Sequence, residues 1–529
     1  MVSKVLKSLH DESSKRPTFR GEVKRMYRRE LPGQMKMDVP FNVELNAESK
    51  WVQLADMLPW DEIEDGYAKT FTGKNEGQVA KSSRLAFCAV YIYISEGITD
   101  EKVVRYIQEN PHLQYFCGFA EYSPRPPFDS SLMTHFRKRI TPKMVMELTE
   151  SVFTQEALKL MDVPPPKPEE TEETKEDTDE TAPTPEPREA PTRGTLLLDA
   201  TCFPQNMKYP TDIGLLNHAR ELCEQVIDAL YSQVAEKNER KPRTYREVAR
   251  KDFLSYAKTR KHTAKTIRSH IRKQLNYVAR NLRTIDDLIA RGADVAEIKK
   301  SLQMKLPVIR ELYRQQKEMY DNNIKRCDNR IVSISQPHVR PIVRGKEHTP
   351  TEFGAKVSIG LVGGYAFITD MSWKNVSEAK LMELAAENYK RQFGFYPANI
   401  IGDGVYPNRD NRKWCKARGI RLSGPALGRK TEETKLEEKR QQYKDACERN
   451  AVEGSFGTTK CKFGLGCVMA KLPDTSQTSI SMGFFVANME RTLRLVANAK
   501  AKNKVHTFIF YDFDLMNLVI HECLITDIA

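Results

Sequence analysis

The chain has 529 residues, 40% of them hydrophobic, and a formal net charge of +13 at pH 7. This length exceeds what one hydrophobic core organises, so we expect two to four domains. The longest apolar run, residues 85 to 94, is too short to span a bilayer, and the N-terminus lacks the order of a signal peptide; we therefore expect an intracellular protein rather than a membrane or secreted one.

The charge is unevenly distributed along the sequence. Residues 162 to 193 hold eleven acidic and four basic residues, which leaves about +20 on the rest of the chain. Residues 237 to 330 hold 26 Lys or Arg against 11 Asp or Glu. A local basic excess of this kind indicates a polyanionic partner.

A helical domain is predicted at residues 81–161, after an arm at residues 1–80 that shows little periodicity. Helices are expected at residues 83–96, 100–110 and 129–140, with Asp129 as the cap of the third.

The last of these helices ends on three basic residues, Arg137, Lys138 and Arg139. They suit a helix that lies against a DNA backbone or in a groove. The alternative is a solvated basic end that complements the helix dipole.

Residues 162–194 are predicted to be a flexible linker. Their Pro, Glu, Thr and Asp composition provides too little apolar surface to offset the entropy of ordering.

After a strand, residues 213–330 have helical periodicity and few Gly or Pro residues, which predicts a helical insertion. Its charge excess favours a DNA-facing role over a merely solvated hairpin.

The remaining sequence, residues 195–212 and 331–529, alternates strands and helices. Strands are expected at residues 195–201, 355–361, 365–369, 399–402 and 420–423, with helices at residues 376–390 and 408–418. This order is that of an α/β ribonuclease H-like fold with a mixed sheet, interrupted by the helical insertion after its first strand. In that fold the first and fourth strands are neighbours.

In two of the expected strands the apolar run ends on an aspartate. Asp199 follows the apolar run of the first strand, and Asp403 follows that of the fourth. A buried carboxylate is unfavourable unless it lies beside a cation or metal, so the two acids indicate a metal site. The alternative is that aspartates often end strands because turns and helix caps favour them.

A third acid, Glu453, lies on a predicted helix. Arg449 and Lys460 share its helical face, because they stand four residues before it and seven after it. An ordinary salt bridge between residues four apart would also explain Arg449. Gly454 and Gly457 weaken such a helix, which favours a close approach by backbone or ligand.

At these residues the chain resembles the DDE transposases of bacterial insertion sequences, in the branch with a Tyr-x2-Arg-x3-Glu-x6-Lys signature. Arg449, Glu453 and Lys460 match its last three positions, whereas Ala446 occupies the tyrosine position. Further similar phrases are Asp199–Thr201, Tyr209–Asn217, Glu352–Lys356, Gly419–Pro425 and, near the N-terminus, Phe128–Ile140.

The resemblance implies a Mg-dependent enzyme. Asp199, Asp403 and Glu453 would hold two Mg²⁺ ions, with Mn²⁺ as a substitute, because hard oxygen ligands select these metals. Arg449 and Lys460 would bind phosphates. Tyr406 either contacts DNA or packs in the core.

The resemblance further implies a cytoplasmic, nucleoid-associated transposase that binds the inverted repeats of an element as a homodimer. It would cleave double-stranded DNA and transfer the 3′ ends to a target. Two alternatives remain: a ribonuclease H-like nuclease without strand transfer, and a non-catalytic DNA-binding relic of a transposase.

Overall fold

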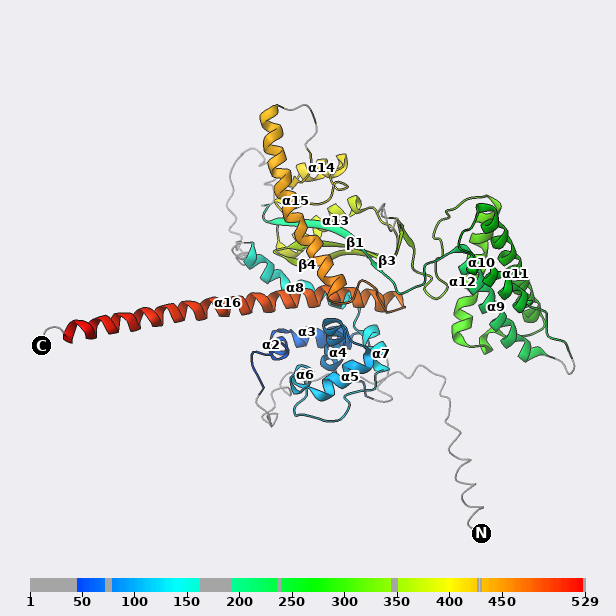
Figure 1. Ribbon diagram of the computed structural model, residues 1–529, viewed down its shortest axis with the longest axis horizontal. Coiled ribbons are helices and arrows are strands. Elements are labelled where there is room, and N and C mark those ends of the chain that lie inside the picture. The colour runs from blue at the N-terminus through cyan, green and yellow to red at the C-terminus, as the bar shows by residue number, and fades with distance from the viewer. Residues whose placement is uncertain are drawn as a thin grey trace, which may run out of the picture. The chain divides into compact units, whose positions relative to one another are not determined.

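A computed structural model shows the fold in residues 45–71, 79–161, 192–235, 239–343, 351–425, 428 and 431–526 (Figure 1). Most of the expected arm and nearly all of the expected linker therefore lie outside the described residues. The chain divides into two compact units, one formed by residues up to 89 with residues 104–140, the other by residues 90–103 and 141–529. Each is described separately. No helix within the described ranges has the length and apolar content that a membrane crossing needs.

The N-terminal region is helical. Its helices are α2 (Lys50–Met57), α3 (Trp60–Ala68), α4 (Ser83–Glu96), α5 (Asp100–Glu109), α6 (Pro111–Phe116) and α7 (Leu132–Arg139). The side chain of Asn110 caps α6 by accepting hydrogen bonds from the next turn, ahead of a proline at the first helical position. The rings of Trp51 and Trp60 pack on Phe116, with centroids 5.5 and 6.0 Å apart.

Two features of this region differ from the sequence prediction. Helices α2 and α3 lie within residues 1–80, the arm for which the sequence predicted no particular structure. Asp129 does not cap α7, whose N-cap is Ser131; its carboxylate instead accepts a hydrogen bond from the backbone N–H of Ser131, at 2.9 Å. That bond closes the turn before the helix. The Ser131 side chain, and after it this backbone N–H, lowers the pKa of Asp129 by hydrogen bonding to its carboxylate.

The second unit contains a mixed sheet. Its strands are β1 (Thr195–Pro204), β2 (Pro341–Val343), β3 (Thr351–Val362), β4 (Tyr365–Ser372), β5 (Asn399–Ile401) and β6 (Arg421–Leu422). The order is β2-β3-β1-β5-β6, with β4 also paired to β3. This mixed α/β architecture is consistent with a ribonuclease H-like domain.

Strand β1 lies at the centre of the sheet. It runs antiparallel to β3, with Asp199 opposite Ile359, and parallel to β5, with Leu197 opposite Ile401. The expectation that the first and fourth predicted strands lie side by side is therefore confirmed. Strand β2, which the sequence analysis did not predict, pairs with the first residues of β3.

Several helices pack on this sheet. They are α8 (Pro142–Leu160), α13 (Leu381–Phe393), α14 (Arg409–Lys416), α15 (Glu432–Cys461) and α16 (Pro473–Thr526). Helices α8, α13 and α16 contact β4, and α15 contacts β1. The Phe153 ring lies between Tyr365 and Phe485, at 5.2 and 5.5 Å, so α8 belongs to this unit and not to the N-terminal domain to which the sequence analysis assigned it.

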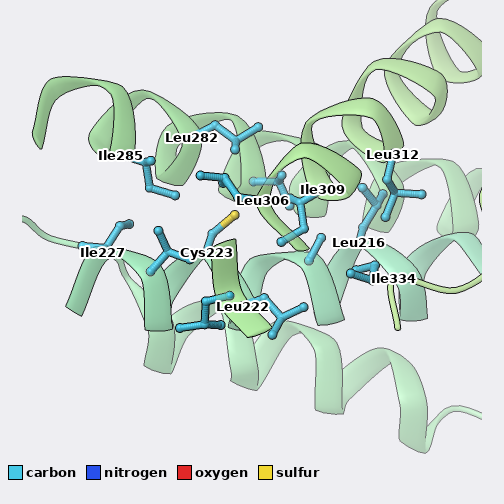
Figure 2. Close-up of a cluster of buried hydrophobic side chains, with 14 of the residues drawn as sticks. Leu216, Leu222, Cys223, Ile227, Leu282, Ile285, Leu306, Ile309, Leu312 and Ile334 are labelled. Carbon is cyan, nitrogen blue, oxygen red and sulfur yellow. The ribbon is translucent and has the colours of Figure 1, made fainter. Parts of the chain in front are cut away.

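Between β1 and β2 the chain forms what we call the four-helix segment, residues 212–321. In its described part are α9 (Asp212–Val234), α10 (Arg246–Lys258), α11 (Ala264–Ala290), the short 3-10 helix Val295–Glu297 and α12 (Lys300–Asp321). Leucine and isoleucine side chains from α9, α11 and α12 form its own core (Figure 2). Beside this core, the buried Arg220 guanidinium is paired with Glu224 and Asn217.

Candidate active site

Two acids lie at the same level of the sheet. Because Leu197 pairs with Ile401 in parallel register, Asp199 and Asp403 each stand two residues beyond that pair. Neighbouring strands lie about 4.8 Å apart, so Asp403, just after the end of β5, comes beside Asp199, which lies within β1.

Helix α15 covers the face of β1 on which Asp199 lies. Side chains alternate along a strand, so Asp199, Thr201 and Phe203 share one face. Lys460 of α15 donates a hydrogen bond from Nζ to Thr201 Oγ1 at 2.8 Å and lies over the Phe203 ring at 5.3 Å. The last turns of α15 therefore cross β1 just beyond Asp199.

Arg449 connects the other two acids. Its Nη1 donates to Asp403 Oδ1 at 3.0 Å, and its Nη2 donates to Glu453 Oε1 at 3.4 Å. The salt bridge expected between Arg449 and Glu453 is therefore present, and Arg449 also bonds to the loop after β5. One guanidinium thus stands between a carboxylate of the sheet and a carboxylate of the helix.

Asp199 lies in the electrostatic field of its acidic and basic neighbours. Burial is the largest cause of a raised pKa for this carboxyl, and the carboxylates of Glu378 and Asp403 raise it further. The backbone N–H of Ala200 and the Arg449 guanidinium act in the opposite direction. Asp199 therefore lies within the field of both Asp403 and Arg449.

The chemistry of these side chains fits a divalent cation. All three offer hard carboxylate oxygens, which Mg²⁺ and Mn²⁺ prefer, and two of them already share one positive charge. Among the described residues, no three His, Cys, Asp or Glu side chains lie close enough together to hold a metal as they stand. The Arg449 guanidinium occupies the space between Asp403 and Glu453.

The raised pKa of Asp199 predicts a dependence of stability on pH. Because the folded-state value lies above the unfolded one, ionisation of Asp199 destabilises the native protein, and the free energy of unfolding falls as pH rises through this window. In metal-free buffer, Asp199→Asn should therefore unfold at higher denaturant concentration than the wild type at pH 7. The difference should shrink as the pH falls toward the unfolded value of about 3.9.

A matched control for this experiment is Asp410→Asn, because Asp410 is exposed on α14. The control should leave the denaturation midpoint nearly unchanged at both pH values. An Asp199→Asn variant that is no more stable than the wild type at pH 7 would contradict a raised pKa of Asp199 in the folded protein.

Tyr406 packs in the core. Its side chain is 1% exposed, and burial raises the pKa of its hydroxyl. The DNA contact assigned to it is therefore wrong, and the alternative of a packed aromatic holds. The ring lies against Gly402, where a Cβ would stand 2.5 Å from Tyr406 Cδ2. Tyr406 thus shapes the loop that carries Asp403.

This contact predicts different outcomes for the two glycines that flank Asp403. Gly402→Ala should displace the ring or the loop and destabilise the protein by about 2 kcal/mol, the range of overpacked cores. Gly404→Ala, where a Cβ meets nothing within 4 Å, is the control. Denaturant unfolding should separate the two variants; equal stabilities would show that the ring does not constrain the loop.

An ion pair that the sequence did not predict lies beside the acids. Lys356 on β3 donates from Nζ to Glu378 Oε1 at 2.9 Å, and the side chains are only 12% and 18% exposed. The same Nζ reaches the Val376 carbonyl at 2.8 Å. Since Glu378 acts on Asp199, the pair forms part of its surroundings. The signal was in the Glu352–Lys356 phrase, to which no role had been given.

Ala446 lies beside Arg449. It lines a hollow of about 200 Å³ together with Gly402, Gly424, Asp445 and Arg449. The signature tyrosine position therefore faces open space next to the residue that connects the acids.

The basic end of α7 has a partly structural role. Arg139 donates from Nη1 to the Thr70 carbonyl at 3.0 Å, and its guanidinium lies 3.6 Å from the centre of the Phe71 ring. It therefore ties α7 to the residues after α3. Lys138 is exposed and Arg137 is half-buried, and a DNA contact by these residues stays a prediction.

Two protein-family models match the chain. One, described as "Transposase DDE domain", matches residues 400–490, and the other, described as "Transposase domain (DUF772)", matches residues 40–139. The first match contains Asp403, Arg449, Glu453 and Lys460, while Asp199 lies before it.

Comparison with curated proteins gives a partial relative. The "Uncharacterized protein ORF8 in nfe locus" of Rhizobium meliloti is 33% identical over 107 residues, which are 20% of this chain and 51% of that protein. The chain thus spans about half the length of this relative. No solved structure matches the chain significantly.

The sheet, the acids joined by Arg449 and the two family matches together define a class of protein. Both matches are to transposase families, and together they support a DDE transposase of insertion-sequence type, as the motifs had indicated.

Proposed function

We propose that this protein cleaves double-stranded DNA at the inverted-repeat ends of an insertion sequence and joins the freed 3′ ends to target DNA. The observation that carries the proposal is the connection of Asp403 to Glu453 through one Arg449 guanidinium, next to the central strand β1 that carries Asp199. Three acids gathered at a central strand with a basic partner suit phosphodiester chemistry.

In this proposal Asp199, Asp403 and Glu453 hold two Mg²⁺ ions within a ribonuclease H-like domain. Bound Mg²⁺ supplies activation of a water or 3′-hydroxyl and stabilisation of the leaving oxygen. Arg449 leaves the carboxylates and binds a DNA phosphate, for which its planar guanidinium is suited. Lys460, held over β1 by Thr201, places a second positive charge along the same DNA strand.

We also propose how the protein contacts its DNA and assembles. The N-terminal helices, with Lys138 exposed at the end of α7, contribute contacts to the element end, and a homodimer holds two ends together. The DNA substrate places the protein with the nucleoid in the cytoplasm.

The experiment that tests this function supplies the protein with Mg²⁺, a labelled duplex that carries the DNA flanking its gene, and a target plasmid. Joined products with the labelled 3′ end covalently in the plasmid support transposition. Cleavage without joining supports a ribonuclease H-like nuclease. Binding without cleavage supports a non-catalytic, DNA-binding relic of a transposase. Asp410→Asn serves as an active control, because that acid lies outside the cluster.

A further inference from the structure

The charge of the four-helix segment is concentrated at one corner. Residues 250–273, which run from α10 through the turn into α11, hold nine Lys or Arg and one acid. That acid, Asp252, is already engaged, since it accepts hydrogen bonds from Lys273 Nζ at 3.1 Å and from the Tyr277 hydroxyl at 2.6 Å. The corner therefore has a large uncompensated positive charge.

Elsewhere in the segment, many of the bases are paired with acids. Examples are Arg246 with Asp228, Arg291 with Glu239, Arg310 with Asp286, Arg314 with Glu311 and Glu318, and Lys317 with Asp321. Pairs of this kind neutralise one another locally. The net charge of the segment is thus a property of the corner and not of its whole surface.

Most of the corner bases have exposed side chains. We define the basic corner by Arg250, Lys251, Lys258, Arg260, Lys261, Lys265 and Arg272. In the part of the chain that the structure describes, none of these seven forms an ion pair with an acid. Seven exposed cations at the junction of two helices attract a polyanion and gain by releasing its counterions.

Ring contacts hold the turn between the helices in place. Tyr256 of α10 stacks on His262 at 3.9 Å and lies 4.9 Å from His270 of α11. Thr263 caps α11 by accepting a hydrogen bond from the Thr266 N–H. Since the backbone is fixed, binding a ligand here requires only the long side chains to become ordered.

We propose that the basic corner binds the phosphate backbone of duplex DNA at a position separate from the catalytic acids. Lys and Arg are the residues that contact phosphates without reading sequence, and they dominate this surface. His262 already covers one face of the Tyr256 ring, which leaves less aromatic surface for an unpaired base and favours a duplex over a single strand. The identity of the partner rests on the proposed function.

The test measures the affinity of the full chain for duplex DNA over a range of salt concentrations. The triple variant Arg260→Gln, Lys261→Gln, Lys265→Gln removes three charges from the corner. Each lost phosphate contact reduces the slope of log affinity against log salt by about 0.9, so we expect a reduction of roughly three. Affinity at low salt should fall more than tenfold.

A matched control removes three charges elsewhere in the segment. Arg283, Lys299 and Lys300 are exposed and have no ion pair among the described residues. They stand eighteen or more positions along the chain from Lys265, roughly 27 Å along α11 to Arg283 alone. Their triple glutamine variant should keep most of the wild-type slope. Equal losses in the two triple variants would overturn the proposal, as would an unchanged slope in the corner variant.

The test separates this inference from the proposed function. If the wild type binds duplex DNA and the corner variant behaves like its control, only the inference fails. If the corner variant loses duplex binding while the wild type neither cleaves nor joins DNA, the inference stands and the proposed transposition fails. Tighter wild-type binding to duplex RNA or to single-stranded DNA than to duplex DNA would also overturn it.

Discussion

Replacing Asp403 with asparagine is expected to reduce DNA cleavage and joining by about three orders of magnitude. The amide keeps the size of the side chain and an acceptor for Arg449, but it removes a charged metal ligand. The charge stabilisation that a bound metal supplies to phosphodiester transfer is several kcal/mol, and each 1.36 kcal/mol corresponds to a factor of ten in rate. Gel analysis of labelled products over time measures the loss.

The same variant should bind duplex DNA as the wild type does and unfold at a similar denaturant concentration, since Asp403 is more than half exposed. Asp410→Asn should retain full activity. A fully active Asp403→Asn protein would exclude this carboxylate from the chemistry.

Replacing Lys356 with methionine is expected to lower the free energy of unfolding by about 3 kcal/mol, the lower end of the range for breaking a buried pair. The substitution leaves the Glu378 carboxylate largely buried without its cation. It also leaves an uncompensated negative charge in the field of Asp199, whose pKa Glu378 already raises. Cleavage should also need less Mg²⁺, because the extra negative charge attracts the divalent cation. Denaturant unfolding and a metal titration of activity measure the two effects.

A double-mutant cycle identifies the interaction. The variant Lys356→Met, Glu378→Gln should be more stable than Lys356→Met alone, because the unpaired charge is gone, with a coupling energy of about 1–3 kcal/mol. Lys374→Met, at an exposed lysine after β4, is the control and should change little. Strictly additive losses would show that the pair does not stabilise the protein.

The sequence predicted that Asp199 and Asp403 would be neighbours, because that follows from strand order. Asp199 and Asp403 each follow an apolar run, and the parallel pairing of β1 with β5 brings them to one level. Helical spacing likewise predicted that Arg449 and Glu453 share a face, which their hydrogen bond confirms. Helical periodicity could not predict that Arg449 also reaches Asp403, because that contact joins two different elements.

Tertiary packing explains what the sequence could not predict. Tyr406 follows an acid in a loop, as a ligand-contacting aromatic would, but its ring fills the space above Gly402. Arg139 ends a helix, where dipole and DNA arguments apply equally, yet it lies on Phe71. Helix α8 has the same local pattern as its N-terminal neighbours, and only its aromatic contacts to β4 and α16 show that it belongs to the sheet unit.

The central claim is that Asp199, Asp403 and Glu453 together hold two divalent cations. Anomalous diffraction from crystals of the protein bound to duplex DNA and soaked in Mn²⁺ tests it directly. We expect two anomalous peaks bounded by these three carboxylates, with the Arg449 guanidinium turned away to a phosphate. Mn²⁺ peaks that lie elsewhere, or a Mn²⁺-loaded site from which any one of the three acids is absent, would contradict the account.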